Sequence, residues 1–321
     1  MLWARAGIEY PLRLRHMDYM KVLDLSNEPY AQAEQVSPLV RRVLAHNPSP
    51  FSYTGTQTYI VGQGGVAVID PGPLGDDPGH VEALIRILAD ERVVAILCTH
   101  THRDHSPAAA PLAAATGAPI IGCAPLVLED DGPRADASFD ATYAPDRVLA
   151  DGEKVSGPGW TLTAIATPGH TSNHLCFALE EEAALFTGDH VMGWSTSVVS
   201  PPDGDMAAYM RSLGLLMTRE DQIYYPAHGA PIETPHRLVR GMMGHRKQRE
   251  GQILRLLGEG VGHIPDMVAH MYKGVDKRLH PAAGRSVLAH LIDLRDRGLV
   301  TGADADWVRV QTPDMEKETA L

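Results

Sequence analysis

Three histidines and an aspartate occupy four of six consecutive positions in the stretch HTHRDH: His100, His102, Asp104 and His105. The segment VVAILCT (93–99) just before them is apolar and rich in β-branched residues, which predicts a buried strand. Side chains at i and i+2 of an extended segment point the same way, so His100 and His102 can coordinate one cation together. A turn after them would bring Asp104 and His105 to a second position nearby. The chain must therefore fold with a buried strand that opens onto a polar edge.

Three more apolar strands are predicted to end in a turn residue beside a histidine or an aspartate. His170 follows WTLTAIATPG, Asp189 follows ALFTG, and His228 follows IYYPA. We expect these ends to converge on one edge of a sheet, because catalytic residues in α/β folds usually lie on the loops there. The combined set of five imidazoles and two carboxylates suits zinc, with iron or manganese as alternatives.

The size of this set predicts two divalent metal ions. Each ion would have three protein ligands if Asp189 bridges the two, which leaves room for a bridging hydroxide. Two cations roughly 3.5–4 Å apart lower the pKa of the water between them and stabilise a developing oxyanion, which is the chemistry of hydrolysis. Any one of these residues alone would be interpreted as a core histidine or a capping aspartate. All seven together at strand ends favour the metal site.

The spacing of apolar residues divides the chain into two parts. Strand-like runs alternate with helical ones in the first part, which predicts a mixed catalytic domain over residues 1–240. Two short helices and a small hairpin are predicted afterwards, within IPDMVAHMYKG, GRSVLAHLIDLRDRG and GLV…DWVRVQ. After a preceding long helix, this is the order of a winged helix, expected over residues 241–312. Residues 313–321 are expected to form a polar tail.

A long helix is expected to join the two parts. Thr234 can cap it, Pro235 suits its first position, and Gly258 is its expected end. We expect the apolar residues of the C-terminal part to cover an apolar surface of the catalytic domain, in particular Leu254, Leu257, Leu288 and Leu291.

Composition excludes several classes of function. The chain of 321 residues carries a formal net charge of −12, which disfavours binding to polyanions. Its N-terminus lacks the apolar segment of a secretory signal, and no run is long and apolar enough for a membrane span. The three cysteines (Cys98, Cys123 and Cys176) lie far apart in apolar segments and are expected to be buried thiols. These features predict a cytoplasmic protein without a membrane partner.

The motif HxHxDH, followed in order by PGHT, TGD and PAHG, resembles the metallo-β-lactamase fold hydrolase superfamily. The resemblance implies an α+β fold, a four-layer αβ/βα sandwich with the site at one edge of two facing sheets. It also implies that Asp70, in VAVIDPGP, supports the site from outside the ligand set. The implied ligands are His100, His102 and His170 for the first metal, Asp104, His105 and His228 for the second, and Asp189 between them.

The stretches NPSPFSYTGTQTYIVG, HTHRDHS and TGDH, with the appended helices, are similar to the beta-lactamase-like protein two group. The C-terminal domain of that group is a winged helix. Its members include a mitochondrial endoribonuclease, and fungal thioesterases of polyketide pathways are related. Many superfamily members have glycines after the histidine motif, where this chain has Ser106, Pro107 and Ala108. We expect a local change of shape there without loss of the metals.

The ligand set alone does not choose among ester, thioester, lactone, β-lactam and phosphodiester substrates. The first 240 residues hold 16 basic and 29 acidic residues, which disfavours long nucleic acids. The resemblance also separates this chain from the glutathione-thioester hydrolases, which end in a different helical appendage. The leading hypothesis is a dinuclear metal-dependent hydrolase in which a metal-bridging hydroxide attacks a small ester-, thioester- or lactone-like substrate. Asp104 and Asp189 would be its catalytic carboxylates.

Two alternatives belong to other classes. The first is a metal-dependent endoribonuclease or phosphodiesterase whose winged helix contacts RNA, and the second is a regulator whose winged helix binds DNA. The candidate recognition helix mixes three arginines with two aspartates, which is typical of a solvated face. A packing or dimerisation role for the winged helix is therefore favoured, and homo-oligomerisation stays open. The residues concerned are Arg285, Arg295, Arg297, Asp293 and Asp296.

Three residues near the ligands have expected roles of their own. His174 and His190 are expected to make hydrogen bonds that support the ligands. Trp194, in the loop after Asp189, is expected to line the substrate cleft.

Overall fold

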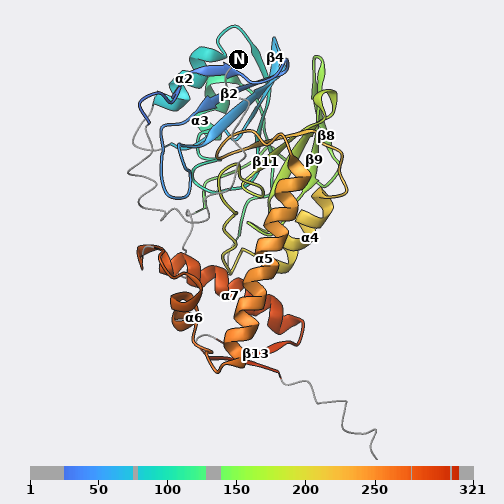
Figure 1. Ribbon diagram of the computed structural model, residues 1–321. Helices are drawn as coiled ribbons and strands as arrows, with labels where there is room; N and C mark the ends of the chain where they lie inside the picture. Colours follow the sequence, from blue (N-terminus) through green and yellow to red (C-terminus); the bar gives the residue numbers. More distant parts are fainter. Residues whose placement is uncertain (1–24, 75–78, 128–138, 276, 304–305, 311–321) are drawn as a thin grey trace, which may run out of the picture.

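Two β-sheets lie face to face in the N-terminal part of the chain, above a group of helices at its C-terminal end (Figure 1). The computed structural model describes residues 25–310 apart from 75–78, 128–138, 276 and 304–305. The polar tail predicted at residues 313–321 lies outside the described residues.

The first sheet follows the order of the chain. Its strands are antiparallel from β1 to β4 and parallel from β4 to β7. Strands β4 and β5 are almost entirely apolar, as expected for parallel strands that are covered on both faces. The strands found among the described residues are β1 (Ala33–Gln35), β2 (Val40–Leu44), β3 (Gln57–Val61), β4 (Gly65–Ile69), β5 (Arg92–Cys98), β6 (Ile120–Gly122) and β7 (Arg147–Val148).

The second sheet has the order β12-β11-β10-β9-β8. Its strands are antiparallel except for the edge pair β11 and β12, which is parallel. Because β11 and β12 are parallel, the residues that follow them leave the sheet at the same end of the strands. The strands are β8 (Lys154–Gly157), β9 (Trp160–Ala166), β10 (Leu175–Leu179), β11 (Ala184–Gly188) and β12 (Ile223–Pro226).

Aromatic side chains fill the space between the two sheets. Tyr59 of β3 and Phe186 of β11 are buried, with their ring centroids 5.1 Å apart. Trp160 of β9 is also buried, and its Nε1 donates a hydrogen bond to the Gly65 carbonyl at 2.7 Å. Each fully buried aromatic side chain stabilises the fold by about 1.5–3 kcal/mol. This packing holds the sheets together and thereby positions the strand ends relative to one another.

Helices cover the outer faces of both sheets and complete the predicted four layers. Leu84 of α2 (Gly79–Ile87) and Leu112 of α3 (Ala109–Thr116) pack on the first sheet. Leu213 of α4 (Met206–Leu216) and Val239 of α5 (Pro235–Gly258) pack with Leu185 of β11 on the second. The prediction of an αβ/βα sandwich is confirmed. Among the described residues, no helix has both the length and the apolar character that a bilayer span requires.

The long helix α5 has the predicted bounds, and Thr234 occupies the N-cap position as predicted, but its side chain does not cap the helix. The Thr234 side chain makes no capping hydrogen bond, because its backbone, at φ −130° and ψ 65°, departs from the extended geometry of side-chain caps. Its carbonyl oxygen instead accepts from the backbone N–H groups of Arg237 and Leu238 at 3.1 and 3.2 Å. Pro235 has no N–H and needs no cap.

The C-terminal elements form a winged helix, as predicted. The second half of α5 packs against α6 (Ile264–Met271) and α7 (His280–Asp296). A short 3-10 helix (Lys277–Leu279) precedes α7, and a hairpin of β13 (Val300–Ala303) and β14 (Asp306–Arg309) follows it.

The predicted cover of the catalytic domain by four leucines is wrong. Leu257 and Leu291 are buried within the winged helix's own core, and Leu254 and Leu288 pack against that core. The helices that carry them face each other, so their apolar sides meet inside the C-terminal unit. Val239, Met242 and Ala289 instead join the apolar cluster that α4 forms over the second sheet. The domain boundary expected between residues 240 and 241 falls inside α5, which contributes to both cores, and that boundary stays a proposal.

Candidate metal centre

Four strand ends converge at one edge of the two sheets. Strand β5 leads to His100, β9 to His170, β11 to Asp189 and β12 to His228. Backbone hydrogen bonds tie the ends together: the Leu175 N–H donates to the Thr99 carbonyl at 2.8 Å. On the other side of the site, the Ala227 N–H donates to the Gly188 carbonyl at 3.1 Å. All seven predicted side chains are thus brought to one place, in two adjoining groups.

The first group contains three imidazoles and one carboxylate whose candidate ligand atoms all lie within 4.8 Å of one another. The His102 Nδ1 lies 2.9 Å from the His100 Nε2 and 3.1 Å from the His170 Nε2. The Asp189 Oδ2 lies 3.6 Å from the His170 Nε2. All four side chains are buried. Buried nitrogens and a carboxylate oxygen directed at one point are the donors that a transition-metal ion requires.

The second group contains His105, His228 and Asp104, again within 4.8 Å. The His228 Nε2 lies 3.3 Å from the Asp104 Oδ2 and 3.2 Å from the Asp189 Oδ1. The His105 Nε2 lies 3.5 Å from the same Asp189 Oδ1. Asp189 therefore turns one oxygen to each group, which is the arrangement expected of a bridging ligand.

The outward ring nitrogens of three histidines meet hydrogen-bond acceptors. The His170 Nδ1 lies 2.6 Å from the Val198 carbonyl oxygen, and the His228 Nδ1 lies 3.1 Å from that of Gly55. The His105 Nδ1 lies 3.0 Å from the Asp70 Oδ2. A ring that donates through Nδ1 presents its lone pair on Nε2, toward the centre. The buried His105 Nε2 and Asp189 Oδ1 lie close to other candidate ligands but meet none of the described residues in hydrogen-bonding geometry. These residues fit a metal centre.

The protonation states favour metal binding at the first group. Burial, followed by the neighbouring imidazoles, holds the pKa of His100 well below its usual range. Burial and the nearby His170 ring lower the pKa of His102 to about 3. Burial tends to raise the pKa of Asp189, but His228 and His105 outweigh it and hold that pKa well below the usual range. Neutral imidazoles and an ionised carboxylate are the forms that bind metal.

The two histidines of the second group favour the protonated, positively charged form when no cation is bound. Burial opposes the charged form of His228, but Asp189 and Asp104 raise its pKa to about 10. The pKa of His105 is likewise raised well above its usual range by Asp104 and Asp189, again against the effect of burial. A bound cation would replace these protons as the partner of the carboxylates, so metal binding here would release protons.

One of the two predicted supporting histidines makes the expected hydrogen bonds. The His174 Nε2 accepts from the Asp189 backbone N–H at 3.2 Å, and its Nδ1 lies 2.8 Å from the Thr167 hydroxyl. The prediction for His190 is wrong: within the described part of the chain neither of its ring nitrogens has a hydrogen-bond partner. His190 instead packs on the Tyr209 ring, at 4.8 Å between centroids. Tertiary packing placed that ring against the rings of Tyr209 and His174, which its position beside Asp189 did not reveal.

Family comparison agrees with this arrangement. The profile described as "Metallo-beta-lactamase superfamily" matches residues 53–228, more than half of the chain. The chain belongs to the metallo-beta-lactamase superfamily. Residues 264–307 of this superfamily hydrolase match the profile "Beta-lactamase associated winged helix domain".

Individual relatives cover most of the hydrolase. It is 30% identical over 281 residues to "Lactamase-like protein ptaB" of Pestalotiopsis fici, covering 83% of this chain and 82% of that protein. It is 35% identical over 237 residues to "Atrochrysone carboxyl ACP thioesterase" of Aspergillus chevalieri, covering 72% and 70%. The solved structure of a beta-lactamase domain protein from Burkholderia ambifaria has the same fold, with a TM-score of 0.72 and 20% identity over 87% of this chain and 94% of that one.

A stacked aromatic pair flanks the hydrolase's centre on the His228 side. The rings of Tyr53 and Trp194 lie 5.2 Å apart, at 17° to each other. Gly193, next to Trp194, donates its N–H to the His228 carbonyl at 2.8 Å. Tyr53 lies two residues before Gly55, whose carbonyl meets the His228 ring. Tyr53 was not predicted from the sequence; its left-handed backbone (φ 59°) is visible only in the structure.

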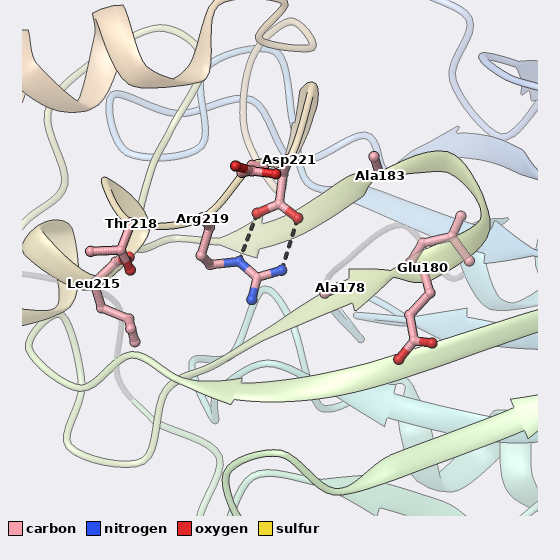
Figure 2. A pocket seen from close by; sticks show the side chains of 9 residues that line it. Ala178, Glu180, Ala183, Leu215, Thr218, Arg219 and Asp221 are labelled. Atoms are coloured by element: carbon pink, nitrogen blue, oxygen red, sulfur yellow. Dashed lines mark hydrogen bonds and ion pairs between the residues drawn. The ribbon is translucent and has the colours of Figure 1, made fainter.

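A surface hollow elsewhere on the hydrolase is unrelated to the centre. It is bounded by Glu180, Ala183, Leu215 and Arg219, at the end of β10 and β11 away from Asp189 (Figure 2). The Arg219 guanidinium is already paired with Asp221 through two contacts of 2.7 and 2.8 Å. Because β11 runs its whole length between this hollow and Asp189, the hollow has no part in the chemistry of the centre.

Proposed function

We propose that this hydrolase cleaves acyl thioesters, with a carrier-bound acyl group as the substrate class. The observation that carries the proposal is the relationship to proteins named "Atrochrysone carboxyl ACP thioesterase", of which those of Aspergillus chevalieri and Aspergillus fumigatus are 35% and 33% identical to this chain. These relatives cover 72% and 75% of it. The proposal narrows the ester, thioester and lactone substrates predicted from sequence to one class.

The two groups at the strand ends would hold two divalent cations, most readily zinc, with iron or manganese as alternatives. His100, His102 and His170 would hold one, Asp104, His105 and His228 the other, with Asp189 between them. When bound, such ions supply Lewis-acid activation of water and of the substrate carbonyl.

Asp104 and Asp189 are the proposed catalytic carboxylates. Asp189 lies against the histidines of both groups and would keep the two cations together. The Asp104 side chain is 20% exposed, more than any of the six others, so it can reach water that enters the site. Its carboxylate is the proposed acceptor for the proton that the attacking water loses.

Thioester hydrolysis places modest demands on such a site. The water oxygen forms a bond to the acyl carbon, the C–S bond breaks, and the sulfur takes the bonding electrons. A thiol has a pKa of about 8.5, so the thiolate departs without needing a proton in the same step. The products are a carboxylic acid and a thiol. An alkoxide leaving group from a phosphodiester would need a proton donor or direct metal contact.

The aromatic pair Tyr53 and Trp194 would line the wall that the acyl group contacts. Both rings are partly exposed, and both are placed by backbone that touches His228. Flat aromatic faces favour planar, unsaturated or aromatic acyl groups. This role agrees with the cleft position predicted for Trp194.

The arginines of α7 and of its C-cap position do not favour the RNA alternative. Arg297 pairs with Glu250 at 2.6 Å, and Arg295 lies 3.2 Å from Asp296. Arg285 is turned toward the loop after β11, where it donates to the Pro201 carbonyl. A phosphate-binding stripe needs arginines free to contact the backbone of the nucleic acid. We therefore retain a small substrate, a packing role for the winged helix, and a reducing, cytoplasmic environment for the three free cysteines.

The decisive experiment is a substrate panel with one purified, metal-loaded sample. Release of free thiol would be followed with a chromogenic disulfide reagent, using acyl-carrier-protein, coenzyme A and N-acetylcysteamine thioesters. Matched oxygen esters, a lactone, a β-lactam and single-stranded RNA complete the panel. We expect chelator-sensitive turnover of thioesters well above that of the oxygen esters. Chelator-sensitive cleavage of RNA with no thioesterase activity would replace this proposal with the endoribonuclease.

A further inference from the structure

The loop that follows Asp189 lies between the metal centre and the winged helix. On its inner side, the Val198 carbonyl oxygen lies 2.6 Å from the His170 Nδ1. On its outer side, two carbonyls that lie on either side of Val198 in the sequence meet two arginines. Arg246 of α5 donates from Nη2 to the Ser197 carbonyl, and Arg285 of α7 donates from Nη2 to the Pro201 carbonyl. One loop thus contacts a candidate ligand and two helices of the C-terminal part.

Arg246 is unusually placed for a charged residue. It is only 4% exposed, and its guanidinium carbon lies 5.2 Å from the centre of the Tyr209 ring. Among the described residues it makes no ion pair, and its guanidinium donates a hydrogen bond to a backbone carbonyl. Burying a guanidinium without a carboxylate partner costs several kcal/mol. Because this buried guanidinium donates to a loop carbonyl, we infer that it serves to fix the position of the loop.

Arg285 contacts the same loop three to four residues after Ser197. Besides its bond to the Pro201 carbonyl, its Nε lies 3.4 Å from the Ser200 hydroxyl. Arg285 is half-buried and lies in the first half of α7, whereas Arg246 lies in the middle of α5. The two arginines therefore fix the loop from two separate helices, on either side of Val198 in the sequence.

We propose that Arg246 and Arg285 are positioning residues through which the winged helix sets the orientation of His170. The path is short: each guanidinium holds a loop carbonyl, the loop presents the Val198 carbonyl, and that carbonyl accepts the Nδ1 proton of His170. The His170 Nε2 is thereby aimed at the first ligand group, 3.1 Å from the His102 Nδ1. This inference rests on the proposed metal centre. It explains why the winged helix is packed against the catalytic domain.

The test is a cobalt titration of the full chain. Metal would be removed with a chelator, and Co²⁺ added while the visible absorption bands and a competing chromophoric chelator report two dissociation constants. In Arg246→Ala and in Arg285→Ala we expect one of the two constants to weaken by about 10-fold or more, with a changed band for that site, and the other to stay near wild type. Arg246→Lys, which keeps a donor and the charge, should recover part of the loss.

Arg249→Ala is the matched control. Arg249 lies one turn further along α5, and its guanidinium contacts the Met271 carbonyl and the Tyr272 ring, both inside the winged helix. Its loss should lower the melting temperature without changing either Co²⁺ constant. Equal weakening in Arg249→Ala would overturn the inference, because general destabilisation would then account for the effect.

The remaining outcomes are distinguishable. Wild-type Co²⁺ constants in both Arg246→Ala and Arg285→Ala, with native circular dichroism, would refute the positioning role and leave the metal centre intact. If Arg246→Ala does not fold, Arg285→Ala decides, because Arg285 is the less buried of the two. Failure of the wild-type chain to bind Co²⁺ would instead overturn the metal centre, and this inference with it.

Discussion

The Asp70 carboxylate holds His105 from outside the candidate ligand set, with 3.0 Å between its Oδ2 and the His105 Nδ1. The same carboxylate accepts two hydrogen bonds from Thr99, one from the backbone N–H and one from the hydroxyl, each at 2.8 Å. Asp70 adopts a left-handed backbone (φ 48°), which a residue other than glycine keeps only where its surroundings enforce it. The supporting role that the resemblance implies for Asp70 is thus visible as three contacts.

Asp70→Asn should weaken metal binding at the second group. The amide can still accept from Thr99, but it then presents N–H donors to the His105 Nδ1 and disfavours the tautomer with a free Nε2. We expect an affinity loss of about 10–100-fold for one zinc equivalent, measured by calorimetric titration of chelator-treated protein. Asp146→Asn is a matched control, because Asp146 accepts from the Ile120 backbone at the start of β6, away from the centre. Unchanged zinc affinity in Asp70→Asn would contradict the prediction.

The two proposed catalytic carboxylates should differ in what their removal costs. Elemental analysis of the wild-type chain should find close to two transition-metal equivalents, since two ligand groups are present. Asp189→Ala should lose both equivalents and nearly all hydrolysis, because Asp189 contacts both groups. Asp104→Ala should retain one equivalent, held by the first group. Full activity with two bound metals in Asp104→Ala would show that Asp104 is no ligand.

Removal of the stacked aromatic wall should affect substrate binding more than the chemical step. In Trp194→Ala we expect KM for a bulky acyl thioester to rise by about 10-fold, as expected for a lost aromatic contact of about 0.5–1.5 kcal/mol together with its buried area, and kcat to change less. Phe51→Ala is the control, since Phe51 is 38% exposed in the same loop as Tyr53. A fall in kcat at constant KM would place Trp194 in the chemistry instead.

Acid should destabilise the packing of α5 on α7. Burial, then Arg246, His245 and Arg249, lower the pKa of His290 to about 3, with a smaller contribution from Arg297. Burial and the same two α5 arginines lower the pKa of His245 to about 4. Both folded-state values lie below the unfolded value of about 6.5, so protonation favours unfolding. The stability is complete above about pH 6.5, and each group removes up to about 1.4 kcal/mol per pH unit as the pH falls toward its folded value.

Urea unfolding at pH 7.5 and at pH 5 tests this in the wild-type chain and in His290→Gln. The variant cannot take up the proton, so its free energy of unfolding should fall less between the two pH values, by about 1–2 kcal/mol. Metal-ligand histidines titrate in both proteins and cancel in the comparison. An identical pH dependence in the two proteins would refute the prediction.

The sequence by itself determined the features that depend on local pattern. Apolar runs such as VVAILCT specify strands because a strand covered on both faces has no polar positions, and β5 lies where that run predicts it. The bounds of α5 follow from Pro235 and Gly258, which act on the backbone of their own segment. The histidine and aspartate positions after four strand ends predicted one site, because strands of a sheet that run in the same direction, as β9, β11 and β12 do, deliver their carboxyl ends to a common edge.

Only the tertiary structure decided which groups meet across long separations. The carbonyls of Gly55 and Val198 have no side-chain signature, yet they hold the rings of His228 and His170. The Thr234 side chain makes no capping hydrogen bond because of its local backbone geometry. The His190 ring makes none of the predicted hydrogen bonds because of how it packs. The four leucines that we expected at the domain contact belong to the core of the winged helix, because helix periodicity identifies an apolar face but not the surface against which that face packs. The burial of Arg246 against the loop beside the metal centre depends on how α5 crosses α4, a relationship set by the packed core and not by any stretch of sequence.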